Sequence, residues 1–201
     1  MLALISPAKK LDFETEPKLN DHTQPDLLSQ SEILVKSARR LSRNQLAQTM
    51  KLSDNLADLN YQRYQDFSTP FDLGNAKQAA LVFNGDTYVG LQAGSLTKAD
   101  MKFAQNHLRI LSGLYGVLRP LDLIQPYRLE MGARFKPPRK TDLYDFWDGQ
   151  ITDALNQVLD GQKDNTVVNC ASNEYFKSVK AKKLDGPVIT PVFKEIKDGQ
   201  S

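Results

Sequence analysis

Arginines and glycines in one central segment form the strongest candidate site for binding an anion. The segment reads RILSGLYGVLRPLDLIQPYRLEMG and covers residues 109–132. Its glycines Gly113 and Gly116 indicate a tight turn after a helix, and the pattern predicts a helix-hairpin-helix over about residues 97–125. Such a hairpin brings backbone N–H groups and a helix N-terminus close to one phosphate, because glycine carries no side chain to block the approach. A purely structural turn would explain the same two glycines.

Positive charge is concentrated around this turn. Residues 98–140 hold nine Lys or Arg and three Asp or Glu, a local charge of +6 (9 − 3). The whole chain carries +2, so the remainder carries −4 (2 − 6). A basic segment on an otherwise acidic chain attracts polyanions, because each neutralised phosphate releases counterions. A solvated basic face is the alternative interpretation.

Two kinds of side chain would complement the turn on a nucleic acid. Arginines could add charge on neighbouring phosphates, and Tyr115 and Tyr127 could stack on an unpaired base. Lysines that follow residue 176 would extend the positive surface, unless they form a solvated face. The candidate DNA-binding residues are Lys9, Lys10, Arg109, Gly113, Tyr115, Gly116, Arg119, Arg128, Lys177 and Lys180.

A second candidate site lies in the segment NCASNEY, residues 169–175, which joins a predicted strand to a helix N-terminus. Anions bind at such places, so Asn173 and Glu174 form a candidate anion or acid site. Helix capping alone would also explain these residues. In an enzyme that acts on nucleic acid or nucleotides, Glu174 would work with Asp86 or Asp145 as acid and base. Nothing in the spacing shows that these three carboxylates meet.

Common metal and cofactor motifs are missing from the sequence. The two histidines are far apart and lack metal-ligand spacing, and the phosphate-loop, dinucleotide-binding and serine-hydrolase motifs are absent. We therefore expect neither metal nor cofactor. The only cysteine, Cys170, follows an apolar run and is expected to be buried and unreactive. The apolar runs are far shorter than the roughly 20 residues of a membrane helix, and no signal peptide is evident, so we expect a cytoplasmic protein without a membrane partner.

The hydrophobic pattern predicts a single domain of mixed α/β (α+β) class over residues 1–201, with a mixed sheet flanked by helices. The first third is predicted to be mainly helical after a short strand, and helices and strands alternate in the last third. The main predicted elements are a strand at 2–5, a capped helix from 97 to about 107, a helix at 147–160, and strands at 166–169 and 188–196. The turn signal Asp198-Gly199 has no second strand after it, which predicts a fragment of a longer protein.

Six blocks of the sequence, taken together, resemble the YaaA peroxide-stress protein family. They are ISPAKKLD (5–12), GDTYVGLQA (85–93), QNHLRILSGLYGVLRPLDLIQPYRLEMG (105–132), LYDFWDGQIT (143–152), ASNEYFKSVK (171–180) and PVF (191–193). The resemblance implies a cytosolic prokaryotic protein that protects against hydrogen peroxide, with lower free intracellular iron and less oxidative DNA damage. It also implies binding of duplex, bubbled and junction DNA through a positive cleft and a helix-hairpin-helix, within the family's mixed α/β "cantaloupe" fold. Family members continue past residue 201 with a further strand and a Lys/Arg-rich stretch, so a C-terminally truncated family domain is expected.

Residues and resemblance together favour a non-enzymatic DNA-binding protein of the peroxide response. The alternative is a nucleic-acid- or nucleotide-processing enzyme that uses the three carboxylates named above. A third hypothesis, iron sequestration, would need clustered carboxylate or histidine ligands, and the sequence displays no such cluster.

Overall fold

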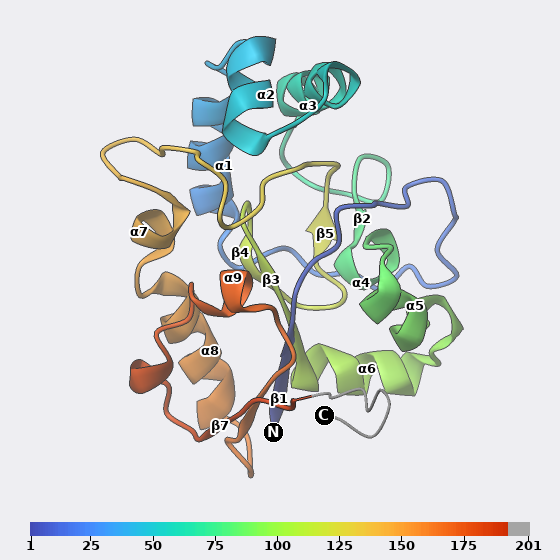
Figure 1. The fold of residues 1–201 in the computed structure, drawn as a ribbon. Coiled ribbons are helices and arrows are strands. Elements are labelled where there is room, and N and C mark those ends of the chain that lie inside the picture. Colours follow the sequence, from blue (N-terminus) through green and yellow to red (C-terminus); the bar gives the residue numbers. More distant parts are fainter. Residues whose placement is uncertain (193–201) are drawn as a thin grey trace, which may run out of the picture.

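A five-stranded sheet forms the centre of the structure, a computed structural model that describes residues 1–192 (Figure 1). Its strands are β1 (Leu2–Ile5), β3 (Leu108–Ser112), β4 (Gly116–Leu118), β6 (Val167–Asn169) and β7 (Val188–Ile189), in the order β4-β3-β1-β6-β7. Strand β1 is parallel to both β3 and β6, β6 is parallel to β7, and β4 is antiparallel to β3. The sheet is therefore mixed, and the expected mixed α/β class is confirmed.

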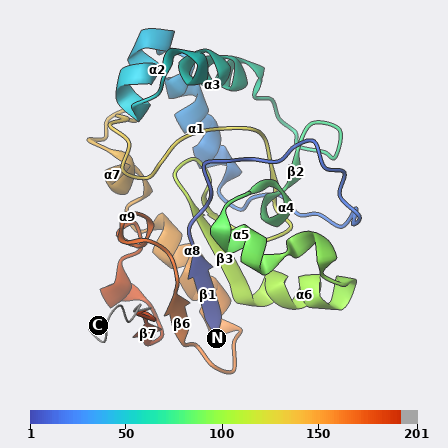
Figure 2. The same ribbon diagram turned by 45° about the vertical axis from the view of Figure 1, so that its right-hand side comes forward.

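The central strands of this sheet are covered on both sides. Four of their side chains are fully buried: Leu2, Leu4, Ile110 and Leu111. Such strands have nearly continuous apolar runs instead of alternating polar and apolar residues. Helices α6 (Lys98–His107) and α8 (Gln150–Asp160) lie to either side of β1 in Figure 1, and Figure 2 shows α8 behind β1.

Helix α8 shows how the sequence pattern produces its packing. Its residues Ile151, Leu155 and Leu159 are buried and recur every four positions, which places them on one helix face. The helix expected over residues 147–160 is present as two pieces, α7 (Leu143–Trp147) and α8. Between them Asp148 takes a positive φ of 40°, which interrupts the helix.

Three helices gather at one end of the molecule, as Figures 1 and 2 both show: α1 (Leu28–Ala38), α2 (Arg43–Met50) and α3 (Asp54–Asp66). The predicted helical character of this region is confirmed. Helix α2 begins with a capping box, in which the Ser42 hydroxyl accepts from the Gln45 N–H and the Gln45 side chain accepts from the Ser42 N–H.

The remaining elements pack beside the sheet and include a two-stranded antiparallel sheet of β2 (Lys77–Gln78) and β5 (Leu123–Ile124). The others are α4 (Ala79–Val82), α5 (Asp86–Leu91), η1 (Ala93–Ser95), α9 (Asn173–Phe176) and η2 (Ala181–Lys183). Helix α6 has the predicted capping box, because the Asp100 N–H donates to the Thr97 hydroxyl (3.2 Å) and the Thr97 N–H donates to Asp100 (3.1 Å).

The structure contradicts the helix-hairpin-helix expected over residues 97–125. Helix α6 ends at His107, and residues 108–118 form a β-hairpin made of β3 and β4. The cause is tertiary packing: β3 lies between β1 and β4, so a short apolar run is buried on both faces there. An apolar run of this length does not show whether its residues follow the helix or the strand period. Its position inside the sheet decides the conformation.

The C-terminal predictions are covered only in part. Of the strand expected over residues 188–196, only Val188–Ile189 (β7) is strand, and residues 190–192 are irregular. Residues 193–196 and the Asp198-Gly199 turn lie outside the described residues. Within residues 1–192, no helix combines the length and the apolar character that crossing a membrane requires.

Candidate functional site

The carboxyl ends of β1 and β6 meet at one edge of the sheet and form the base of the candidate site. The chain moves from β1 to β3 on one side and returns to β6 on the other, so β1 is a topological switch point. In open α/β sheets, ligands bind outside the strand carboxyl ends at such a point. The Ser6 hydroxyl ties the two strand ends together, since it accepts from the Ser172 N–H (2.9 Å) and donates to the Ser172 hydroxyl (3.3 Å).

Residues 128–134 form a wall of the site that faces these strand ends. The Glu174 carboxylate accepts a hydrogen bond from the Gly132 N–H (2.8 Å), and the Arg134 N–H donates to the Thr49 carbonyl (3.1 Å). A side chain at Gly132 would place its Cβ 3.1 Å from the Glu174 carboxylate, so glycine permits this close approach. The wall is therefore attached to α9 on one side and to α2 on the other.

Two adjoining cavities lie between these walls, with volumes of about 80 and 340 Å³. Both are lined by Lys9, Glu130 and Glu174. We call the two cavities together the basic groove. Its charged lining residues are Lys9, Lys51, Arg128, Glu130, Arg134 and Glu174.

The basic groove has a surplus of positive charge, because four cations face two carboxylates. Glu130 uses one oxygen to pair with both Arg128 (2.9 Å) and Lys9 (3.3 Å). The Lys9 side chain is nevertheless 70% exposed. The Arg128 Nε is buried and has no hydrogen-bond partner among residues 1–192. The groove thus offers cationic donors that an anion could use.

The structure brings together three of the residues expected from the sequence: Lys9, Arg128 and Glu174. Others lie outside the groove lining. Lys177 stacks on the Tyr144 ring at 4.7 Å, and Lys180 pairs with Asp148. Lys10 and Asn173 are exposed, and Asn173 is the first residue of α9.

The whole sequence matches a family of known proteins. The family model described as peroxide stress protein YaaA matches residues 1–201. The chain belongs to this family. Curated relatives include UPF0246 proteins of Paraburkholderia phytofirmans (55% identical over 202 residues), Alteromonas mediterranea (54% over 200) and Paraburkholderia xenovorans (54% over 202). These alignments cover all of this chain and 77–78% of each relative.

In this YaaA family member, Arg109 is a structural residue, which corrects its expected role at a phosphate. It is only 7% exposed, and its guanidinium donates to the carbonyls of Gln105 and Leu108 (2.8 Å each). Burial lowers the pKa of Arg109 to about 10, so the side chain stays charged at neutral pH. Its N–H groups thus bind carbonyl groups at the end of α6 and the start of β3.

Arg119 is also engaged within the fold. Its guanidinium pairs with the buried Asp122 (2.9 Å) and with Asp26 (3.0 Å), and it donates to the Gln24 carbonyl (2.6 Å). Burial of Asp122 raises the pKa of its carboxyl, while the neighbouring guanidinium opposes this rise. The Arg119 guanidinium is therefore committed to pairs within the fold, and its expected phosphate contact stays a prediction.

The turn residues have structural roles too. Tyr115 is 0% exposed, its ring packs edge-to-face on Tyr127 at 5.2 Å, and its hydroxyl accepts from the Gln125 N–H. A ring buried in this way has no face for a base, so the expected stacking on Tyr115 and Tyr127 is wrong. A Cβ at Gly113 would lie 2.2 Å from the Leu129 carbonyl oxygen, and Gly116 has a φ of 71° beside Trp147. These two glycines make the hairpin turn possible and do not face a ligand.

The structure places the three carboxylates of the enzymatic alternative on different elements. Asp86 begins α5, Asp145 lies in α7 and bonds the Lys140 ammonium (3.1 Å), and Glu174 bonds the wall of the groove. The Thr141 backbone N–H, followed by the Lys140 ammonium, lowers the pKa of Asp145, so this carboxyl stays ionised and is a poor general acid. No group of three or more potential metal-ligating side chains occurs in the described part of the chain.

Sequence reasoning missed half of the charged groove residues, namely Lys51, Glu130 and Arg134. Glu130 and Arg134 flank Gly132, a glycine whose close approach to Glu174 became visible only in the fold. Cys170 was expected to be buried, yet it is exposed directly after β6, although its N–H still donates to the Leu4 carbonyl of β1 (2.9 Å).

Proposed function

We propose that this protein binds DNA in the peroxide response, with the basic groove as the centre of phosphate contact, and so limits oxidative DNA damage linked to free iron. Membership of the peroxide-stress family supports the cellular role. The observation that carries the molecular role is the groove at the carboxyl ends of β1 and β6, where Lys9, Lys51, Arg128 and Arg134 converge. Phosphate contacts from such residues supply affinity that does not depend on base sequence.

The ion pairs within the groove affect how tightly it binds a phosphate. Exposed salt bridges contribute about 0–1 kcal/mol, so a phosphate could draw Lys9 away from Glu130 at little cost. Glu130 and Glu174 repel other parts of the polyanion, so only a strand that places its phosphate beside the cations is well bound.

The size of the groove favours distorted DNA. A cavity of about 340 Å³ can hold part of a flexible strand, whereas a duplex can only lay its backbone across the rim. Unpaired strands bend into narrow grooves without the energy cost of unstacking a helix. Bubbled DNA should therefore bind more tightly than the matched duplex.

The test measures binding of duplex and bubbled DNA over a salt series. We would compare wild type with a triple variant, Lys9→Ala, Lys51→Ala and Arg134→Ala. Loss of three phosphate contacts should reduce the slope of log affinity against log salt by about 2–3. The matched control changes three exposed lysines outside the groove lining, Lys98, Lys102 and Lys163, to Ala.

The expected result is a large loss of affinity in the groove variant and a small one in the control. Equal losses in both variants would show that general charge, not this groove, drives binding. Affinity that barely changes with salt would contradict phosphate contact altogether. Protection of bound DNA from nicking by Fe²⁺ and hydrogen peroxide, lost in the groove variant, would connect binding to damage.

A further inference from the structure

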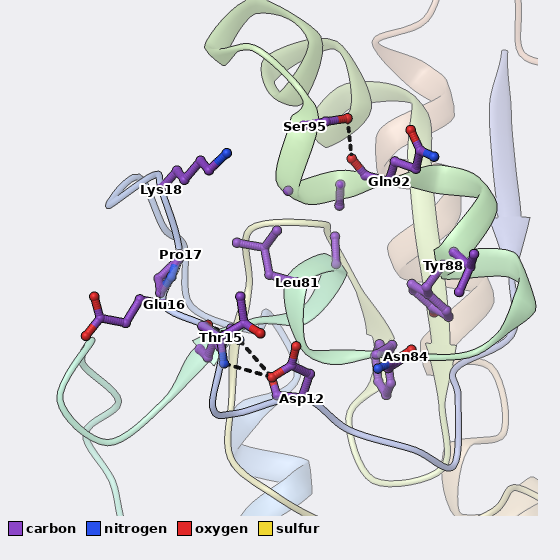
Figure 3. A pocket seen from close by; sticks show the side chains of 16 residues that line it. Asp12, Thr15, Glu16, Pro17, Lys18, Leu81, Asn84, Tyr88, Gln92 and Ser95 are labelled. Atoms are coloured by element: carbon purple, nitrogen blue, oxygen red, sulfur yellow. Dashed lines mark hydrogen bonds and ion pairs between the residues drawn. The ribbon is translucent and has the colours of Figure 1, made fainter.

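A cavity of about 480 Å³ lies apart from the basic groove and shares no lining residue with it (Figure 3). Residues 12–18 form one wall, and α4, α5 and η1 contribute the others. The volume falls in the range of sites for small organic ligands, about 300–1,000 Å³. Four of the 16 lining residues come from the sequence block GDTYVGLQA, which has no part in the basic groove.

The loop wall of this cavity is held in place by two buried side chains of β2. The Lys77 ammonium donates to the carbonyls of Asp12 (2.8 Å) and Thr15 (2.6 Å). The Gln78 carboxamide donates to the carbonyls of Leu19 (2.9 Å) and Asp21 (3.1 Å). The wall is thus formed before any ligand arrives, which reduces the ordering cost of binding.

One carboxylate oxygen is available inside the cavity. The Asp12 Oδ1 accepts from the N–H groups of Glu14 (3.0 Å) and Thr15 (2.9 Å) and pairs with the Lys77 ammonium (3.8 Å), whereas Oδ2 accepts no hydrogen bond from residues 1–192. The hydrogen bond from the Thr15 backbone is the main reason that the pKa of Asp12 is lowered, so the carboxyl is ionised at neutral pH. Figure 3 shows Asp12 below Leu81, within the ring of lining residues.

The rest of the lining provides apolar surface and uncommitted amides. Leu81 and Val89 offer apolar contact. The carboxamides of Asn84 and Gln92 make no side-chain hydrogen bond to another described residue, and Gln92 is held in a left-handed conformation (φ 48°). This conformation ends α5, because the Gln92 N–H donates to the Tyr88 carbonyl (3.0 Å).

The charges of the lining cancel, since Asp12 and Glu16 balance Lys18 and Lys77. A strongly charged ligand therefore gains little from the cavity. An uncharged ligand fits better if it has a flat apolar body, an N–H group for the Asp12 Oδ2, and polar edges for the two amides. A carboxylate reads the exocyclic amino group of cytosine in this way, and an amide pairs with base edges.

We propose that this cavity binds an uncharged, nucleoside-sized heterocycle that carries an exocyclic amino group. The amino group donates to the Asp12 Oδ2, and the ring packs against Leu81 and Val89. The proposal does not rest on the assignment of the DNA groove, so either assignment can fail without the other.

The experiment titrates the full 201-residue chain with cytidine and uridine, and with adenosine and inosine, by calorimetry. Cytidine and adenosine carry an amino group where uridine and inosine carry an oxo group. In uridine and inosine the oxo oxygen, an acceptor, would face the Asp12 carboxylate, which is also an acceptor. Losing a hydrogen bond to a charged group should weaken binding about tenfold or more. Cytidine and adenosine should therefore bind saturably and more tightly than uridine and inosine.

The variant Asp12→Asn makes this specificity test sharper. Its carboxamide oxygen can still accept from the two backbone N–H groups, which turns the NH₂ group toward the cavity. The preference should then reverse in favour of uridine. Glu16→Gln is the matched control, because Figure 3 shows the Glu16 carboxyl pointing away from Leu81, and this variant should keep the preference for cytidine.

Leu81→Trp provides a second variant that leaves Asp12 unchanged. The larger side chain fills the cavity and should abolish binding of all four nucleosides, with thermal unfolding used to confirm that the protein folds. Equal binding of cytidine and uridine, no saturable binding of either amino nucleoside, or an unchanged preference in Asp12→Asn would each overturn the proposal.

Discussion

Replacing Gly113 with alanine tests whether the central turn is structural. The added Cβ would lie 2.2 Å from the Leu129 carbonyl oxygen, while ordinary contact begins at 3.4 Å, so the two backbone segments would have to part by about 1.2 Å (3.4 − 2.2). The Gly113 carbonyl also accepts from the Trp147 indole N–H (3.0 Å, buried), and the shift strains this bond. Overpacking costs about 1–3 kcal/mol and a lost buried hydrogen bond about 1–3 more. We therefore expect the free energy of unfolding to fall by about 2–6 kcal/mol.

Urea denaturation followed by Trp147 fluorescence measures this loss directly. Gly90→Ala is the matched control, since Gly90 lies within α5 and a Cβ there meets no heavy atom within 4 Å. Alanine in a helix is favoured over glycine, so the control should gain about 0.5–1 kcal/mol. A helix-hairpin-helix would give another result, in which Gly113→Ala keeps its stability and loses only DNA affinity. A Gly113→Ala protein within about 0.5 kcal/mol of wild type would refute the close contact.

Three further predictions concern the residues around the two sites. Arg119→Ala leaves the buried Asp122 without its guanidinium and should destabilise the fold by about 3–5 kcal/mol in urea denaturation, whereas a phosphate-contact role predicts normal stability. Tyr64→Phe removes a buried hydroxyl that donates to the backbone of the groove wall (2.7 Å), and should cost about 1–3 kcal/mol together with some DNA affinity in the same salt series. The pKa of Asp12 is lower in the folded state than in the unfolded chain, chiefly through the Thr15 N–H, so its contribution to stability is complete above the unfolded pKa and is lost as pH falls through the folded one. The stability difference between wild type and Asp12→Asn should therefore shrink below about pH 4, and a pH-independent difference would contradict this assignment.

Local sequence signals predicted the parts of the fold that depend on neighbouring residues. The capping box at Thr97 and the four-residue repeat of α8 need only a few positions to be recognised, and both are present. The β3-β4 hairpin was missed because its conformation depends on β1, about a hundred residues earlier in the chain. An apolar run beside a predicted helix gave no local indication that a parallel partner strand was available.

The candidate site was predictable only as separate residues. Lys9, Arg128 and Glu174 were each singled out, but their meeting depends on the parallel pairing of β1 with β6. Counting charge along the sequence also overestimated the number of free cations, because ion pairs form across long separations. Arg119, for example, pairs with Asp26, which lies 93 positions earlier (119 − 26). Charge patterning locates a basic segment, whereas only the fold shows which of its cations remain available.

The segment that follows β1 contacts both proposed sites, which makes coupling between them a testable expectation. Lys9 lines the basic groove, while Asp12, three residues later, lines the nucleoside cavity. The cavity residue Tyr88 donates its hydroxyl to the Ser6 carbonyl (2.8 Å), and the Asn84 N–H donates to the carbonyl of residue 10 (2.9 Å). A ligand that shifts the cavity wall would therefore also shift the backbone that carries Lys9. Because coupling between binding sites is reciprocal, saturating cytidine should change DNA affinity by the same factor as DNA changes cytidine affinity. No change in either affinity would show that the segment does not transmit binding from one site to the other.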